Sequence, residues 1–160
     1  MSPRERSEMI SVSVATFQTS PNPPNPLEQI QNALERGQLE NVQFALFPEG
    51  FLTGYFFRYE DAARVALSTL TVEFNRLLVV SRGFSTVLIV GFLERAEETL
   101  YNSAAVVFEG ELLGIYRKTY PNEKCFGPGL EFPVWQAHGV CFGVNICNDA
   151  NFPEAARALA

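Results

Sequence analysis

The amino-acid sequence predicts a layered domain of mixed α/β or α+β class. Short apolar segments typical of β-strands alternate with longer segments in which apolar residues recur every three or four positions, as in amphipathic helices. Of the 160 residues, 47% are hydrophobic and 19% are charged, which provides enough apolar material for a packed core. No repeat or shift in composition divides the chain, so we expect one domain over residues 1–160.

Six segments have the apolar patterns of β-strands. Residues 10–17 alternate apolar with polar side chains, whereas residues 42–47 form an apolar run of the kind buried within a sheet. The segment Glu109–Gly110–Glu111 is a short connection that contains glycine, which predicts a hairpin between the strands on either side. The expected strands are residues 10–17, 42–47, 86–93, 102–108, 112–116 and 140–146.

Three segments have the patterns of helices. The first is expected to begin near Asn25, with Pro26 in its first turn, and to end near Gly37. The second covers residues 60–82, and the third begins at residues 152–154 and continues to the last residue of the chain. The expected inward side chains of the second helix are Ala63, Leu67, Leu70, Phe74, Leu77 and Leu78.

Charge and hydropathy argue against two classes of partner. Twelve Lys and Arg against eighteen Asp and Glu give a net charge of -6, the wrong sign for binding a phosphate backbone, so we expect no nucleic-acid partner. The apolar runs are much shorter than the roughly 20 residues of a membrane span, so we expect no membrane association. The sequence therefore predicts a soluble protein.

Three cysteines, Cys125, Cys141 and Cys147, are the candidate nucleophiles. Their odd number, the absence of a C-x-x-C pair and the single histidine, His138, argue against a disulfide framework or a zinc site and favour the reducing cytoplasm. Cys147 follows a strand and precedes a helix N-terminus, whose partial positive charge should favour the thiolate. We expect Cys141 to be a packed thiol, Cys125 a half-buried loop residue and His138 a structural or surface residue.

Two charged residues also stand at the ends of apolar strands. Glu49 follows one strand at a sheet edge, where α/β proteins build clefts, and a partly buried carboxylate there can act as general base and acid. Lys118 follows another, and its ammonium group can stabilise the oxyanion of a tetrahedral intermediate. Either residue alone is more often a solvated side chain. Together with Cys147 they predict a hydrolytic site.

Three blocks of sequence surround these residues: FALFPEGFLTGY at 44–55, YNSAAVVFEGELLGIYRKTYPNEKCFGPG at 101–129 and GVNICNDANFPEAAR at 143–157. In order and spacing they resemble the nitrilase superfamily of carbon–nitrogen hydrolases, whose active sites carry a Glu, a Lys and a Cys. The resemblance implies that Glu49 is the general base, Lys118 the family lysine and Cys147 the nucleophile. It also implies a second glutamate at Glu123, which would orient Lys118 or the substrate.

The same resemblance implies a fold and a reaction. The fold would be a four-layer αββα sandwich, of which this chain is the N-terminal part, because the family domain continues beyond the cysteine turn. The reaction would be hydrolysis of a small amide or N-carbamoyl substrate through a thioester, without metal or cofactor, in a homo-oligomer. The backbone N–H of Asn148 would help Lys118 to hold the oxyanion. We expect Asp149 and Glu154 to brace the turn rather than touch the substrate.

The substrate class and the activity of this chain are less closely defined. The run from Ile146 to Asp149 resembles that of some N-carbamoyl-amino-acid amidohydrolases, which places amide and N-carbamoyl substrates ahead of nitriles. One alternative is an inactive fragment or pseudo-enzyme that acts as an interaction module. Another is a glutaminase module that supplies ammonia to a synthetase, because that family shares the same three residues.

Overall fold

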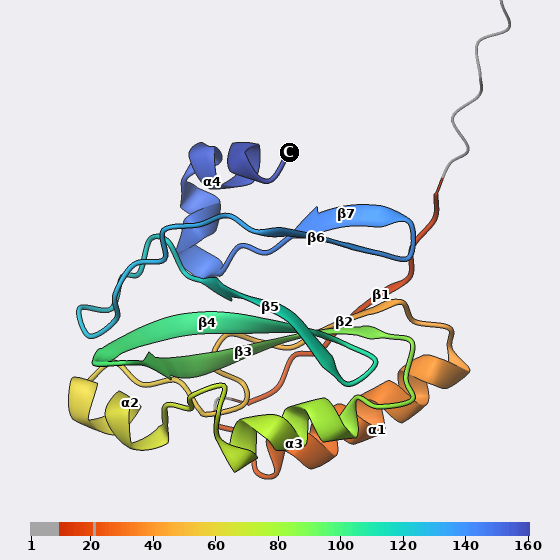
Figure 1. Ribbon diagram of the computed structural model, residues 1–160, viewed down its shortest axis with the longest axis horizontal. Coiled ribbons are helices and arrows are strands. Elements are labelled where there is room, and N and C mark those ends of the chain that lie inside the picture. The colour runs from red at the N-terminus through yellow and green to blue at the C-terminus, as the bar shows by residue number, and fades with distance from the viewer. Residues whose placement is uncertain (1–9, 21) are drawn as a thin grey trace, which may run out of the picture.

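The computed structural model describes residues 10–20 and 22–160 (Figure 1). It confirms the mixed α/β class. The elements in chain order are β1 (Val14–Thr16), α1 (Pro26–Leu39), β2 (Phe44–Leu46), α2 (Tyr59–Val65), α3 (Val72–Val80), β3 (Val87–Ala96), β4 (Thr99–Phe108), β5 (Glu111–Arg117), β6 (Val134–Ala137), β7 (Val140–Gly143), the 3-10 helix η1 (Cys147–Asn151) and α4 (Pro153–Ala158).

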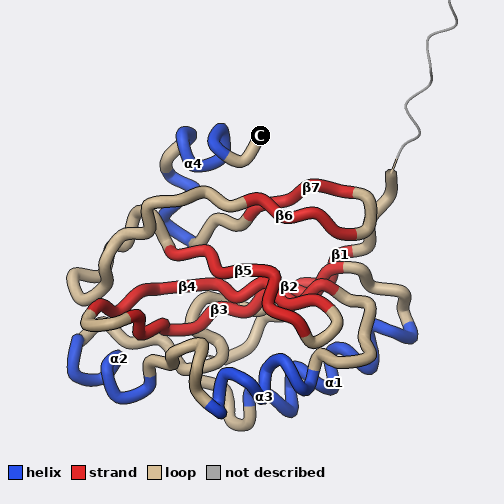
Figure 2. Tube along the Cα trace, in the orientation of Figure 1, coloured by secondary structure: helices blue, strands red, loops and turns tan. Residues whose placement is uncertain are grey.

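Five strands form the central sheet in the order β1-β2-β3-β4-β5. The pairs β1–β2 and β2–β3 are parallel, whereas β3, β4 and β5 are joined as antiparallel neighbours. Helices α1 and α3 cover one face of this sheet, and the β6–β7 hairpin crosses the other face with α4 beyond it (Figures 1 and 2). Across the sheet the layers therefore follow the order helix, strand, strand, helix.

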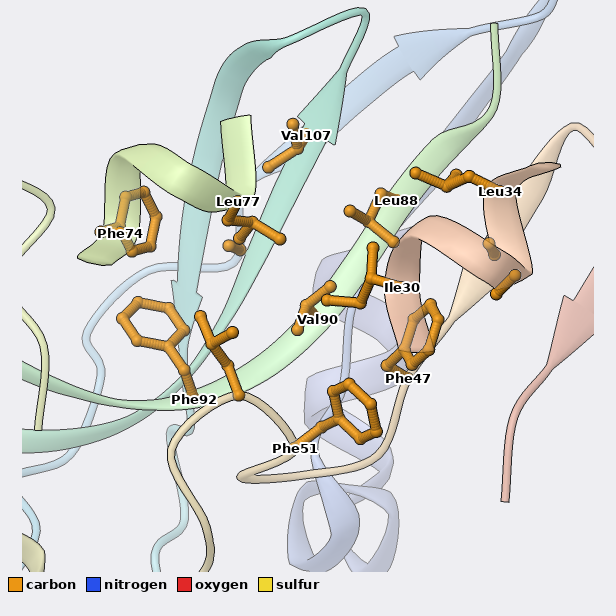
Figure 3. Close-up of a cluster of buried hydrophobic side chains, with 14 residues drawn as sticks. Ile30, Leu34, Phe47, Phe51, Phe74, Leu77, Leu88, Val90, Phe92 and Val107 are labelled. Carbon is orange, nitrogen blue, oxygen red and sulfur yellow. The ribbon is translucent and has the colours of Figure 1, made fainter. Parts of the chain in front are cut away.

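Apolar side chains fill the space on both faces of the sheet. On the helix side, residues of α1 and α3 pack against β3 and β4 (Figure 3). On the hairpin side, residues of β2, β3, β4 and β5 pack against β6, β7 and the segment that follows β7. Burial on two faces explains why β3 begins with an unbroken apolar run, since each fully buried aliphatic or aromatic side chain contributes about 1.5–3 kcal/mol.

The single helix that we predicted over residues 60–82 is wrong, because the structure has two helices there. Between them, Leu67 pairs with the end of β3, donating its N–H to Leu93 O at 2.9 Å and accepting from Arg95 N at 2.9 Å. The second helix then begins anew after Thr71, whose hydroxyl caps Phe74 N at 3.2 Å. The predicted inward position of Leu70 is also wrong, since 89% of this residue is exposed.

The hairpin around Glu109 and Gly110 is confirmed, with both residues at positive φ between β4 and β5. Other strand predictions need correction. The strand expected over 10–17 is limited to β1, and the strand expected over 140–146 ends at Gly143. No pattern in the sequence predicted β6, which pairs with β7 in a separate two-stranded sheet. Among the described helices, none has the length and apolar character needed to cross a membrane.

Candidate active site

Glu49 lies in the turn that follows β2, directly over the middle of β3. Phe47 N donates to Ile89 O at 2.8 Å and Leu52 N donates to Gly91 O at 3.0 Å, which holds the turn against that strand. The close approach requires glycine at position 91, because a Cβ atom there would lie 2.7 Å from the Cα of Glu49. The backbone therefore fixes where the Glu49 side chain starts.

Lys118 lies immediately after β5, and its ammonium group is enclosed between two carboxylates. Its Nζ is 2.8 Å from Glu49 Oε1 and 3.1 Å from Glu123 Oε1, and the side chain is 1% exposed. A buried cation is tolerated when such partners replace water. Burial raises the pKa of Glu123, and the negative charge of Glu49 acts in the same direction. The structure thus brings together three of the predicted residues.

Asn102 joins this cluster, although no motif in the sequence singled it out. Its Nδ2 donates to Glu49 Oε1 at 2.6 Å, the same oxygen that Lys118 contacts. The one signal in the sequence was a polar pair, Asn102 and Ser103, inside an otherwise apolar strand. Burial of an amide within a core requires a hydrogen-bond partner, but the sequence does not reveal which partner it finds.

Cys147 opens η1 with φ of 45°, a left-handed conformation that is uncommon for a residue with a side chain. The residue is exposed, and its thiol lies close enough to the Glu49 side chain for that carboxylate to affect the thiol pKa. Burial of the sulfur and the charge of Glu49 raise the thiol pKa, while Lys118 opposes this shift. The expected preference for the thiolate is therefore not met, because burial of the sulfur and then the charge of Glu49 favour the protonated thiol.

Asp149 connects the turn at Cys147 to the loop that follows Lys118. Its Oδ2 accepts from Ile146 N at 2.9 Å and from Tyr116 Oη at 2.7 Å, and its Oδ1 accepts from Tyr120 N at 2.9 Å. Burial, together with the nearby Asp149, raises the pKa of Tyr116, so its hydroxyl stays a donor. The predicted bracing role of Asp149 is confirmed by these contacts.

Asn148 adds a second link between the turn and the loop, since its Nδ2 donates to Tyr120 O at 2.8 Å. Glu154 lies in the first turn of α4 and is exposed, with Arg157 4.0 Å away. Glu154 occupies the first helical turn as expected, and its role in bracing the turn at Cys147 stays a prediction.

The remaining candidates lie in other surroundings. Cys125 is half-buried as predicted, with its Sγ 3.4 Å from Phe57 O. Cys141 is exposed rather than packed, because it pairs with the exposed Gln136 on the outer side of the β6–β7 hairpin. His138 is structural, with its ring packed edge-on against Phe44 and Phe108. Within residues 10–20 and 22–160, no cluster of His, Cys, Asp and Glu has the arrangement of a metal site.

The fold and this site define a layered α/β protein in which a cysteine thiol faces a carboxylate held by a buried lysine. Residues 13–160 match the model of the carbon-nitrogen hydrolase family, and the chain belongs to this family. The nitrilase superfamily resemblance seen in the three sequence blocks is thereby confirmed.

Known relatives share the same segment. The chain is 33% identical over 158 residues to a nitrilase of Pyrococcus abyssi, covering 93% of this chain and 60% of that protein. It is 28% identical to an N-carbamoylputrescine amidase of Solanum tuberosum, covering 98% of this chain and 56% of that protein. The chain therefore spans somewhat more than half the length of these relatives.

A solved structure agrees with the fold. The amidase from Nesterenkonia sp. superposes with a TM-score of 0.78 at 28% identity, covering 92% of this chain and 59% of that one. In a mutant of that amidase, the acetamide moiety of fluoroacetamide is covalently added at the active-site cysteine. The chain thus superposes on somewhat more than half of that amidase.

Proposed function

We propose that the full-length protein hydrolyses the carbon–nitrogen bond of small amide or N-carbamoyl compounds through an acyl-enzyme at Cys147. The observation that carries this proposal is the Glu49 carboxylate, which lies 2.8 Å from Lys118 Nζ and is near enough to the Cys147 thiol to raise its pKa. A nucleophile in contact with a base, and a base held by a third group, is the general arrangement of covalent catalysis.

The first half of the reaction forms a thioester. Glu49 takes the proton of Cys147 as the sulfur attacks the carbonyl carbon of the substrate. The developing oxyanion is held by the ammonium group of Lys118 and the backbone N–H of Asn148. Glu49 then gives the proton to the leaving nitrogen, and ammonia or an amine departs.

The second half returns the enzyme to its starting state. Water takes the place of the departed amine, and Glu49 accepts a proton from it as the oxygen attacks the thioester carbon. As the intermediate collapses, the C–S bond breaks and Glu49 gives this proton to the sulfur, which releases the acid and restores the thiol. Glu123 keeps Lys118 in place through both halves, since its carboxylate is 3.1 Å from Nζ.

The raised pKa of the Cys147 thiol supports the need for a base. A thiol that stays protonated at neutral pH is a weak nucleophile, so attack must be coupled to proton removal. The charge of Glu49 acts on the Cys147 thiol, whereas Cys125 bonds to a loop carbonyl and Cys141 lies on the hairpin surface. Of the described cysteines, Cys147 is the one whose thiol pKa is affected by both Glu49 and Lys118.

Two comparisons support the choice of substrate class. The S. tuberosum relative is an N-carbamoylputrescine amidase, and the Nesterenkonia structure is an amidase. Hydrolysis of an amide or of an N-carbamoyl group separates ammonia or an amine from a carbonyl carbon, which matches the roles proposed for Glu49 and Lys118. The Asn148 position next to the nucleophile is consistent with either substrate.

Steady-state hydrolysis by the full-length protein tests the proposal. Butyramide and an N-carbamoyl alkylamine serve as substrates for the parent and for Cys147→Ala, Glu49→Gln and Lys118→Met. We expect kcat/KM to fall by about 10³-fold or more in each variant. The matched control is Cys141→Ser, an exposed thiol outside the cluster, which should retain activity. Undiminished hydrolysis by Cys147→Ala would disprove the proposed mechanism.

A further inference from the structure

We propose that Asn102 is a positioning residue for the Glu49 carboxylate, occupying Oε1 so that Oε2 is left to exchange the proton with Cys147. This inference rests on the proposed function, since it assigns a role at the same site. It adds a neutral side chain in the middle of β4 to the set of residues on which the reaction depends.

The two carboxylate oxygens of Glu49 differ in their contacts. Lys118 Nζ lies 2.8 Å from Oε1 and Asn102 Nδ2 lies 2.6 Å from the same atom. A carboxylate oxygen has two lone pairs, so these two donors saturate Oε1. The lone pairs of Oε2 are then the ones that can receive the thiol proton.

The amide of Asn102 points its N–H donor toward Glu49, and its own carbonyl oxygen is left without a hydrogen-bond partner among the described residues. Asn102 is 1% exposed, and its Oδ1 has no hydrogen-bond partner among the described residues. A buried acceptor without a partner is unfavourable, and such atoms in native proteins call for a reason. Turning the amide over would place Oδ1 against the carboxylate at a hydrogen-bond distance of 2.6 Å, where two acceptors repel.

The backbone of Asn102 also positions Lys118, which is the other donor to Glu49 Oε1. Its carbonyl oxygen accepts from Lys118 N at 2.8 Å, which continues the β4–β5 pairing by one residue. The same residue therefore sets the start of the lysine side chain and contacts the carboxylate that this lysine binds. Lys118 places a positive charge beside Glu49, whereas the uncharged amide of Asn102 orients the Glu49 carboxylate through a hydrogen bond.

The adjacent residue provides a matched control. Ser103 is as buried as Asn102, but its side chain points to the opposite face of β4 and donates to Glu94 Oε2 at 2.7 Å. Ser103→Ala therefore removes one buried hydrogen bond from the same strand without changing a contact of Glu49. Any general effect of weakening β4 should appear in both variants.

The first experiment compares Asn102→Leu with Ser103→Ala in the full-length protein, using butyramide as substrate. Leucine has a similar volume but no hydrogen-bond donor. The Glu49 carboxylate therefore loses the hydrogen bond that orients it, while the space around position 102 stays filled. We expect kcat of Asn102→Leu to fall by about 100-fold with KM within about threefold, and Ser103→Ala to keep the parent kcat. Melting temperatures of both variants show whether they fold.

The second experiment uses Asn102→Asp, which has the same shape. At neutral pH the introduced carboxylate faces Glu49 and repels it, so kcat should be low. At lower pH the two carboxyl groups share a proton, and the introduced group can again donate to Oε1. We therefore expect the ratio of variant to parent kcat to rise as the pH falls from about 8 to about 5. A residue that only filled space would not produce this reversal.

The outcomes separate this inference from the proposed function. If Glu49→Gln and Cys147→Ala hydrolyse butyramide as fast as the parent, the proposed function fails. If those two are inactive but Asn102→Leu keeps the parent kcat, or if the Asn102→Asp ratio does not change with pH, only the role of Asn102 is overturned. A low kcat in Asn102→Leu together with the rising ratio in Asn102→Asp supports it.

Discussion

The carboxylate of Asp149 accepts the backbone N–H of Tyr120 at 2.9 Å, which ties the turn at Cys147 to the loop after Lys118. Asp149 is fully buried and receives two further hydrogen bonds, from Ile146 N and the Tyr116 hydroxyl. One carboxylate thus sets the relative positions of two parts of the site that are far apart in the sequence.

Replacing Asp149 should therefore cost both stability and activity. Asp149→Ala leaves three donors without their acceptor in the protein interior, and we expect a loss of about 3 kcal/mol in the free energy of unfolding. Urea denaturation measures this loss. The control is Glu154→Gln on the exposed side of α4, which should change stability by less than about 0.5 kcal/mol. An unchanged denaturation midpoint for Asp149→Ala would contradict the bracing role.

The charges around Cys147 predict opposite shifts in two variants. Because burial and Glu49 raise the thiol pKa, we expect Cys147 to ionise at higher pH than an ordinary cysteine. Glu49→Gln removes a negative charge and should lower the pKa, whereas Lys118→Met removes a positive charge and should raise it. The ultraviolet absorbance of the thiolate, followed against pH with Cys125 and Cys141 replaced by serine, reports each midpoint. Shifts of the reverse sign would disprove this account of the electrostatics.

Gly91 should not tolerate even a methyl group. In Gly91→Ala the new Cβ would lie 2.7 Å from Glu49 Cα, so the turn must move away from β3. We expect kcat to fall by about 100-fold and stability by about 1–3 kcal/mol. Gly83→Ala is the control, since Gly83 has φ of +79° but no atom within 4 Å of the added group. That variant should lose stability through backbone strain and keep its activity.

The ion pair of the buried Glu94 with Arg117 should contribute more to the free energy of unfolding than an exposed ion pair does. Arg117 contacts Glu94 Oε1 at 2.7 Å and Oε2 at 2.8 Å, and Glu94 is 3% exposed. Arg117→Met leaves this carboxylate buried without its cation, and we expect a loss of about 2 kcal/mol, reduced by the partial exposure of Arg117. Arg36→Met, which breaks an exposed pair with Glu40, should cost less than about 0.5 kcal/mol.

A double variant also tests the stabilising interaction between Glu94 and Arg117. Adding Glu94→Gln to Arg117→Met removes the uncompensated charge, so the double variant should be more stable than Arg117→Met alone. Denaturation of the four proteins in this cycle measures the coupling between the two side chains. Additive losses would mean that the pair contributes no coupling.

Much of the candidate site could be predicted because its charged residues end apolar strands. Glu49 and Lys118 each follow such a strand, and the sheet brings them to within hydrogen-bond distance. Asn102 escaped prediction because it lies within a strand, where the sequence shows a polar residue but not the carboxylate that it meets across the fold. The raised pKa of Cys147 was missed for a similar reason, since it depends on how far the fold buries the sulfur and on how closely Glu49 approaches it.

The errors in the fold arise where a tertiary contact overrides a local pattern. The helical spacing of residues 60–82 continues through Leu67, but pairing with the end of β3 draws this residue out of a helix. The alternation of side chains along the last strand does not show which of its two faces packs against the sheet. The exposure of Cys141 could therefore not be predicted without the position of the β6–β7 hairpin. Short strands such as β6 also give little periodicity to detect.

The contact between Lys118 and Glu49 joins residues 69 positions apart. Chain segments so distant in sequence meet only after β2, β3, β4 and β5 have taken their places, because closing the long intervening loop costs conformational entropy. We therefore expect the contact to form after local pairings such as the β4–β5 hairpin. A chain with a different order of strands in its central sheet would not bring these two side chains together.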